Sequence, residues 1–119
     1  MTESLYERFG GTEGVTKIAT TLVHAHMTNP AISTRFADTD VDALISSAAA
    51  FIITGTGGPN VYEGEDMLAV HKGMNISAAE FMAVLDDALT AMQENGVAQR
   101  EQEEMLYIMY SMRGDVVLV

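Results

Sequence analysis

The sequence contains no cysteine, and this absence excludes several kinds of chemistry. A chain without thiols forms no disulfide, has no thiol nucleophile and offers no thiolate to a metal. Covalent attachment of a cofactor through a Cys-x-x-Cys-His segment is excluded for the same reason. Any cofactor must therefore be held by packing and by coordination from other side chains.

Positive charge is also scarce, because 6 Lys and Arg residues stand against 17 Asp and Glu residues, which gives a formal net charge of −11. Binding to nucleic acid phosphates requires clustered Lys and Arg. Anionic membrane surfaces repel a chain of this charge. We therefore expect neither nucleic acid nor a membrane surface as a partner.

Long hydrophobic runs are missing as well. No apolar stretch reaches the length of a membrane span, and the segment from Met1 to Gly10 carries Glu3, Glu7 and Arg8, unlike a secretory signal peptide. A chain of 119 residues is the size of one domain. These features predict a single cytoplasmic domain over residues 1–119.

Apolar residues recur with helical spacing along most of the chain, whereas alternation long enough for a sheet is missing. The pattern predicts an all-α fold. After a short segment that ends at Gly10, one helix is expected from an N-cap at Thr12 to before Pro30, and a second from Val41 to before Gly55. A brief helical turn is expected from Met67 to Gly73. Two more helices are expected, one from a capping box at Ser77 and Glu80 to Gly96 and one over Glu101–Met112.

Three local patterns resemble functional motifs but lack features that those motifs require. The acidic run Asp38–Asp42 lacks the glycine and the final glutamate of a calcium loop, so it is interpreted as a solvated turn before a helix. The glycines at 55–58 follow no predicted strand and precede no Lys-Ser pair, so they do not form a phosphate loop. Asp86 and Asp87 are adjacent and point to different sides of a helix, so they are not an acid–base pair.

The three histidines are candidate metal ligands. His71 lies in an apolar row with Met67 and Met74, where a neutral imidazole could bind a metal, although a hydrogen-bonded core residue is the commoner role for a lone histidine. His24 and His26 are two residues apart, which places them roughly 200° apart around a helix. They cannot grip one metal together, and structural roles are expected for both.

A set of motifs along the chain provides a further indication. These are Leu5-Tyr6-Glu7-Arg8-Phe9-Gly10-Gly11, Asn29-Pro30, Phe36, Gly57-Gly58-Pro59, Tyr62-Glu63-Gly64, Met67, and Val70-His71-Lys72-Gly73-Met74-Asn75-Ile76. In order and spacing the chain resembles the group I truncated haemoglobins. The resemblance implies a two-over-two helical sandwich around non-covalent haem b, with iron held from the proximal side by His71.

The resemblance also implies further haem contacts. Phe36 matches the phenylalanine that packs on the haem at a turn between helices. Met67, Ile76 and Phe81 match proximal or floor contacts, Phe51 and Ile52 match contacts from the opposing helix, and Tyr62 and Lys72 match positions near the haem propionates. Both of these last two side chains could equally be solvated.

The chain departs from the family pattern on the distal side, where a ligand would bind. The position of the usual distal tyrosine falls on Val23, and the usual polar positions of the next helix fall on Leu44 and Ala48, with Ser47 between them. These residues predict an apolar distal pocket, because Val23, Leu44 and Ala48 cannot donate a hydrogen bond to a bound ligand.

Three functions remain open at this point. The first is reversible binding of oxygen or another diatomic gas at a pentacoordinate iron held by His71. The second is a haem enzyme that detoxifies nitric oxide or peroxide, served by a reductase, and the third is a haem-free helical interaction module. We expect a monomer or a weak homodimer, and the sequence does not show whether His24 or His26 reaches the haem.

Overall fold

The computed structural model describes residues 3–119, and its regular elements are helices. Their order is α1 (Leu5–Arg8), α2 (Gly11–Thr28), the 3-10 turn η1 (Ser33–Phe36), α3 (Val41–Gly55), α4 (Met67–His71), α5 (Ala78–Glu94), α6 (Gln99–Ser111) and the 3-10 turn η2 (Arg113–Asp115). Within residues 3–119, strand-like pairing is limited to an isolated bridge between Ile76 and Val117. The predicted all-α fold is confirmed.

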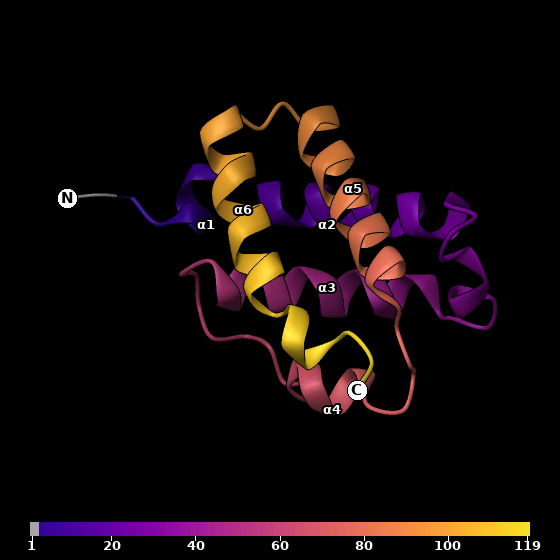
Figure 1. Cartoon of the computed structure of the whole chain (residues 1–119). Coiled ribbons are helices and arrows are strands. Elements are labelled where there is room, and N and C mark those ends of the chain that lie inside the picture. The colour runs from indigo at the N-terminus through magenta and orange to yellow at the C-terminus, as the bar shows by residue number, and fades with distance from the viewer. Residues whose placement is uncertain (1–2) are drawn as a thin grey trace.

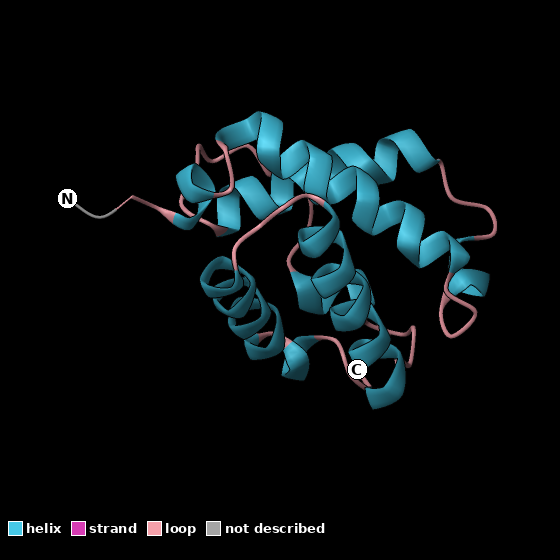
Figure 2. Cartoon of the chain, turned by 90° about the horizontal axis from the view of Figure 1, so that it is seen from above, coloured by secondary structure: helices cyan, strands magenta, loops and turns pink. Residues whose placement is uncertain are grey.

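The four long helices form two crossed pairs. In Figure 1, α2 and α3 run across the view while α5 and α6 run roughly perpendicular to them, and Figure 2 shows the same crossing from above. Helix α2 packs against both α3 and α5. This is the expected two-over-two sandwich. Its larger core cluster contains Leu5, Phe9, Val15, Ile18, Ala19, Leu22, Ala49, Ile52, Ile53, Ala88, Ala91, Met92 and Met105.

Local capping signals set most of the helix ends. The hydroxyl of Ser77 accepts from the backbone N–H of Glu80, and the Glu80 carboxylate accepts from the N–H of Ser77, which confirms the predicted capping box. At the other end of α5, Gly96 has φ +71°, and the N–H of Val97 donates to the carbonyl of Met92 over 3.0 Å. This Schellman arrangement terminates the helix where the sequence predicted.

The predicted start of the second helix is wrong by a short distance. Its N-cap is Gly10, with φ +99°, and Thr12 lies inside the first turn. The hydroxyl of Thr12 shares a 2.7 Å hydrogen bond with the phenol of Tyr6 and does not cap the helix. Thr12 therefore links α1 to α2, because its hydroxyl bonds to Tyr6 of α1 and not to the backbone at the start of its own helix.

The short helix α4 is held at both ends. The Asp66 carboxylate accepts from the N–H of Ala69 at its start, and Gly73, with φ +87°, follows its end. The N–H of Gly73 donates to the carbonyl of Val119, and the N–H of Leu118 donates to that of Ile76. The C-terminus therefore lies beside α4, as Figure 1 shows, and fastens the segment that carries His71.

Candidate functional site

A cavity of about 380 Å³ lies among the helices, within the range of small-molecule and cofactor pockets. Every element from α2 to α6 contributes to its wall. The lining is mainly aliphatic and methionine side chains, and it comprises Leu22, Val23, His26, Ile32, Arg35, Phe36, Leu44, Ser47, Ala48, Phe51, Ile52, Gly55, Thr56, Tyr62, Met67, Val70, His71, Met74, Ile76, Glu80, Phe81, Val84, Met105, Ile108, Met109, Met112 and Val116.

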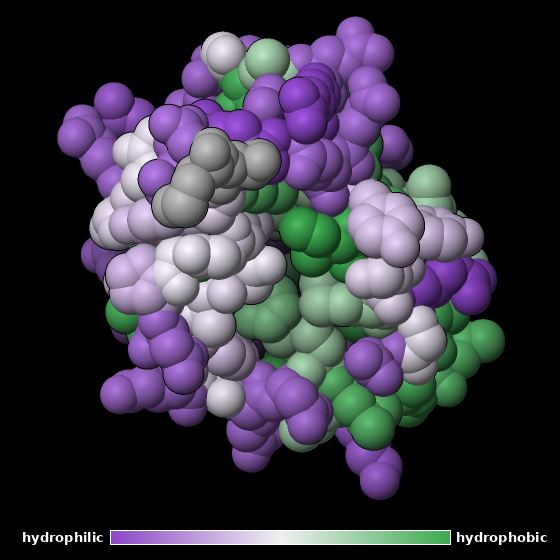
Figure 3. All heavy atoms as spheres, turned by 90° about the vertical axis from the view of Figure 1, so that its left-hand side faces the viewer, coloured by the Kyte–Doolittle hydropathy of each residue, from purple (hydrophilic) through white to green (hydrophobic). Residues whose placement is uncertain are grey.

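The cavity reaches the protein surface. Val70 and Met74, which line it, keep 42% and 38% of their surface exposed. Figure 3 shows a hollow on the face that lies at the left of Figure 1, with apolar surface, drawn in green, above it and along its right side. Apolar side chains therefore form part of the margin where the cavity meets solvent.

The structure brings together almost all of the predicted site residues. Those that line the cavity are Val23, Phe36, Leu44, Ala48, Phe51, Ile52, Tyr62, Met67, His71, Ile76 and Phe81. Lys72 does not line it, because this residue is exposed and its backbone N–H closes α4 on the carbonyl of Leu68. A role for Lys72 at a propionate stays a prediction.

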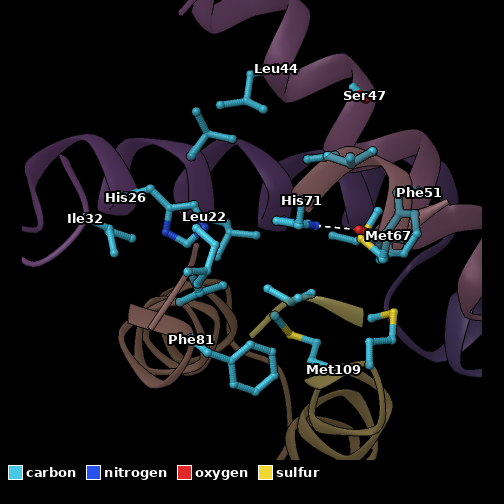
Figure 4. Close-up of a pocket in the computed structure, with 18 of the residues that line it drawn as sticks. Leu22, His26, Ile32, Leu44, Ser47, Phe51, Met67, His71, Phe81 and Met109 are labelled. Atoms are coloured by element: carbon cyan, nitrogen blue, oxygen red, sulfur yellow. Dashed lines mark hydrogen bonds between the residues drawn. The ribbon is translucent and has the colours of Figure 1, made fainter. Parts of the chain in front are cut away.

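His71 projects into the cavity from the last turn of α4. Its Nδ1 lies 2.8 Å from the carbonyl oxygen of Met67, one turn earlier, as the dashed line in Figure 4 shows. A carbonyl only accepts, so Nδ1 carries the proton and Nε2 carries the lone pair. Within residues 3–119, Nε2 has no hydrogen-bond partner. An imidazole fixed in this way is prepared to bind a metal.

The wall opposite α6 is stiffened by a pair of aromatic rings. Phe51 and Tyr62 meet edge to face with ring centroids 5.1 Å apart. The Tyr62 hydroxyl donates to the carbonyl of Glu65 over 2.8 Å, and its backbone N–H donates to the hydroxyl of Thr54. A Cβ added at Gly64 would lie 2.4 Å from the Tyr62 oxygen, so a larger residue there would displace the ring. The loop before α4 is thereby folded onto α3.

An ion pair closes another margin of the cavity. The guanidinium of Arg35 donates to both carboxylate oxygens of Glu80, and its Nη1 donates to the carbonyl of Met74 over 3.1 Å. The hydrogen bond from Arg35, followed by that from Ser77, lowers the pKa of Glu80 to about 2. The pair ties η1 to the start of α5.

His26, in the cavity wall, belongs to a buried polar pair that was not predicted from the sequence. Nδ1 of His26 lies 2.7 Å from Oδ2 of Asp87, and both residues are buried. The prediction that Asp86 and Asp87 point to different sides of a helix is confirmed, since Asp86 is exposed. One signal was available, because Asp87 lies four residues from Ala83 and four from Ala91, both on the buried face of α5.

The contribution of α6 was also not recognised as part of a site. Its methionine and isoleucine face was predicted, but the sequence does not show which cavity that face covers. The residues concerned are Met105, Ile108, Met109 and Met112. The acidic run from Asp38 to Asp42 is a solvated turn, as predicted, in which the Asp40 carboxylate caps α3 by accepting from Ala43.

Comparison with known proteins agrees with this geometry. The family model described as bacterial-like globin matches residues 4–118. The chain belongs to the bacterial-like globin family. This globin is 28% identical over 116 residues to "Group 1 truncated hemoglobin" from Tetrahymena pyriformis, a match that covers 97% of the chain and 95% of the relative. The resemblance to group I truncated haemoglobins is therefore confirmed.

Two further similarities support the assignment. A group 1 truncated hemoglobin, GlbN, from Mycolicibacterium paratuberculosis is 32% identical over 91 residues, covering 74% of this globin and 67% of the relative. The crystal structure of truncated hemoglobin from Tetrahymena pyriformis in its Fe(III) form superposes with a TM-score of 0.94 at 25% identity, covering 98% and 100% of the two chains. Haem with its iron is the cofactor of this family.

The cavity fits that cofactor. Residues 3–119 contain no group of three or more His, Asp or Glu side chains that could hold a bare metal ion. The free Nε2 of His71 in a largely apolar cavity suits a metal whose other ligands come from a flat macrocycle. In the same part of the chain, no helix is long and apolar enough to cross a membrane.

Proposed function

We propose that this globin binds oxygen or another diatomic gas reversibly at a pentacoordinate haem iron held by His71. The observation that carries the proposal is the free Nε2 of His71 in an apolar cavity, with Nδ1 fixed on the carbonyl of Met67. Haem supplies an iron that binds small gases. The protein would hold the iron through His71 and surround the haem with largely apolar side chains.

The apolar side chains that α2 and α3 contribute to the cavity support weak binding of polar ligands. Val23 is 1% exposed and lines the cavity together with Leu44 and Ala48. None of these side chains can donate a hydrogen bond, whereas a donor to a polarised ligand contributes roughly 1.5 to 3 kcal/mol. We therefore propose that oxygen escapes about ten to a hundred times faster than from a pocket with such a donor.

A second candidate function is turnover of nitric oxide or peroxide, with a reductase that restores the ferrous iron. The observation in its favour is His26, a polar group that lines the cavity. Rapid mixing of the oxygenated protein with nitric oxide separates the two functions. A rapid, repeated cycle that yields nitrate supports the enzyme, whereas simple displacement of oxygen supports the carrier.

The decisive test of the first proposal is the absorption spectrum after haem addition. Wild-type protein is expected to give an intense Soret band and a five-coordinate high-spin ferrous spectrum. His71→Leu is expected to lose that spectrum, while His24→Leu, at an exposed position on α2, retains it. Equal spectra for His71→Leu and wild type would refute the assignment of His71 to the iron.

A further inference from the structure

His26 is the second imidazole in the cavity, and it is held in the same manner as His71. Its Nδ1 lies 2.7 Å from Oδ2 of Asp87, whose Oδ1 accepts from the side-chain amide of Asn29 over 3.1 Å. A carboxylate accepts, so Nδ1 of His26 carries a proton, and in the neutral ring Nε2 carries the lone pair. The pair joins α2 to α5 across 61 residues of sequence.

Nε2 of His26 is not sealed inside the protein. It has no hydrogen-bond partner within residues 3–119, and no fully buried side-chain nitrogen or oxygen in that range lacks a partner. Since His26 lines the cavity and is only 8% exposed, the accessible part of its ring faces the cavity. Figure 4 shows the His26 ring among the lining side chains.

The ring is also fixed in orientation. It stacks on Phe36 with centroids 5.7 Å apart and an interplanar angle of 15°. Phe36 itself lines the cavity and matches the family's haem-packing phenylalanine. Val23 lies three residues before His26, one turn away on the same face of α2. The His26 ring therefore shares a face of α2 with the apolar distal position, and two separate contacts hold it.

The other polar side chains of the cavity do not offer a base. Arg35 and Glu80 are bonded to each other, and the Tyr62 hydroxyl donates to the carbonyl of Glu65. The Thr56 hydroxyl donates to the carbonyl of Ile52. A serine hydroxyl, as at Ser47, is not basic at neutral pH, and Nε2 of His71 is assigned to the iron. His26 is thus the basic group available to a ligand.

We propose that His26, positioned by Asp87, accepts the proton of small weak acids that bind in this cavity, such as hydrogen cyanide, hydrogen sulfide and hydrogen peroxide. The H–X bond breaks, its electron pair stays on X, and the proton forms a bond to Nε2. The products are the anion X⁻ and an imidazolium paired with the Asp87 carboxylate. Nothing is oxidised or reduced in this step. The inference rests on the proposed function, because the anion needs the iron as its partner.

Cyanide binding to the ferric, haem-loaded protein tests the proposal. The measurement uses a weakly buffered solution with a pH indicator, at a pH where hydrogen cyanide is un-ionised and the ferric spectrum is the acid form. If His26 keeps the proton, wild type binds cyanide without net proton release. The His26→Gln variant is expected to release close to one proton per haem and to bind about 100-fold more slowly, within the range of general-base assistance.

Matched variants and a second ligand separate proton transfer from packing. His24→Gln, at an exposed site on the same helix, is expected to behave as wild type. Asp87→Asn should slow cyanide binding, because an amide donating to Nδ1 moves the proton to Nε2, while Asp86→Asn should not. Carbon monoxide has no proton to lose, so its binding to the ferrous forms should be the same for wild type and His26→Gln.

The possible results distinguish failure of the His26 inference from failure of the proposed function. An unchanged rate and proton balance in His26→Gln would overturn the inference, as would equal slowing of carbon monoxide. A six-coordinate low-spin ferrous spectrum that disappears in His26→Gln would also overturn it, because His26 would then be an iron ligand. Failure of wild type to give a Soret band with haem would overturn the proposed function itself. A Soret band with no effect of His26 would overturn this inference alone.

Discussion

The Nδ1 atom of His71 lies 2.8 Å from the carbonyl oxygen of Met67, one turn earlier in a helix of five residues. This hydrogen bond sets the tautomer of the ring and directs its free nitrogen into the cavity. The helix is too short to be stable alone. Its position depends on the Asp66 cap and on the backbone bonds from Gly73 and Leu118.

Replacement of His71 tests the role of this nitrogen. We expect His71→Ala to lower haem affinity by at least about 100-fold, or ~2.7 kcal/mol, because the iron–imidazole bond is lost. The measurement is the rate of haem transfer to a scavenger protein. His24→Ala serves as the control and should transfer haem at the wild-type rate. Equal rates for both variants would show that packing alone retains the haem.

A new donor at position 23 tests the apolar distal wall. Val23→Tyr should slow oxygen dissociation by about ten- to a hundredfold, because a phenol that reaches the ligand stabilises its partial negative charge. Carbon monoxide is less polar when bound and should respond less. Flash photolysis and stopped-flow mixing give both rates. A similar slowing of both gases would indicate steric obstruction and not a hydrogen bond.

The ion pair of Arg35 and Glu80 predicts a pH dependence of stability. The pKa of Glu80 is lowered from 4.5 to about 2, so the ionised group stabilises the folded state above pH 4.5, and this contribution is lost as the pH falls toward 2. The Glu80→Gln variant should melt below wild type at pH 6, and the difference should shrink as the pH falls through that window.

Thermal melts across the pH range check this expectation. Gln at position 80 can still accept the hydrogen bond of the capping box, so the variant mainly removes the charge. Glu63→Gln, in an exposed loop, is the control and should show a small difference at every pH. A gap between wild type and Glu80→Gln that stays constant from pH 6 to pH 2 would contradict the assigned role of the pair.

Haem removal should destabilise the fold. A ligand that binds only the native state adds about 2.7 kcal/mol when its free concentration is 100 times Kd. We therefore expect the haem-free protein to have lower helicity and a lower Tm, with the largest loss in the short α4. Circular dichroism of both forms measures this. Superimposable thermal curves would contradict a core built around haem.

Gly96 provides a test of helix termination that is separate from the cavity. It has φ +71° and no neighbouring atom within reach of an added Cβ, so Gly96→Ala carries only a backbone cost of about 1–2 kcal/mol. Gly114 also faces open space but lacks a positive φ, so Gly114→Ala should be close to neutral. Chemical denaturation of both variants gives the comparison. Equal stabilities would refute the Schellman assignment.

Some features of this protein follow from residues that are close together in the sequence. The capping box of Ser77 and Glu80, the stop at Gly96 and the apolar row around His71 were all predicted and are present in the structure. Each depends on groups a few residues apart, which share a turn or a face once the helix forms. The motif spacing that resembles the truncated haemoglobins identified the family for the same reason, since it lies in the order of the residues.

Other features depend on how the helices pack against one another. Thr12 has the chemistry of an N-cap but bonds to Tyr6 across the junction of α1 and α2. Asp87 and His26, 61 residues apart, meet because α2 packs against α5, and no periodicity in either helix specifies that partner. Burial makes an unpaired carboxylate costly, so the crossing that buries Asp87 also requires its hydrogen bonds to His26 and Asn29. The sequence by itself determined the helices and the apolar row around His71, whereas the pairing of His26 with Asp87 was determined by packing between distant segments.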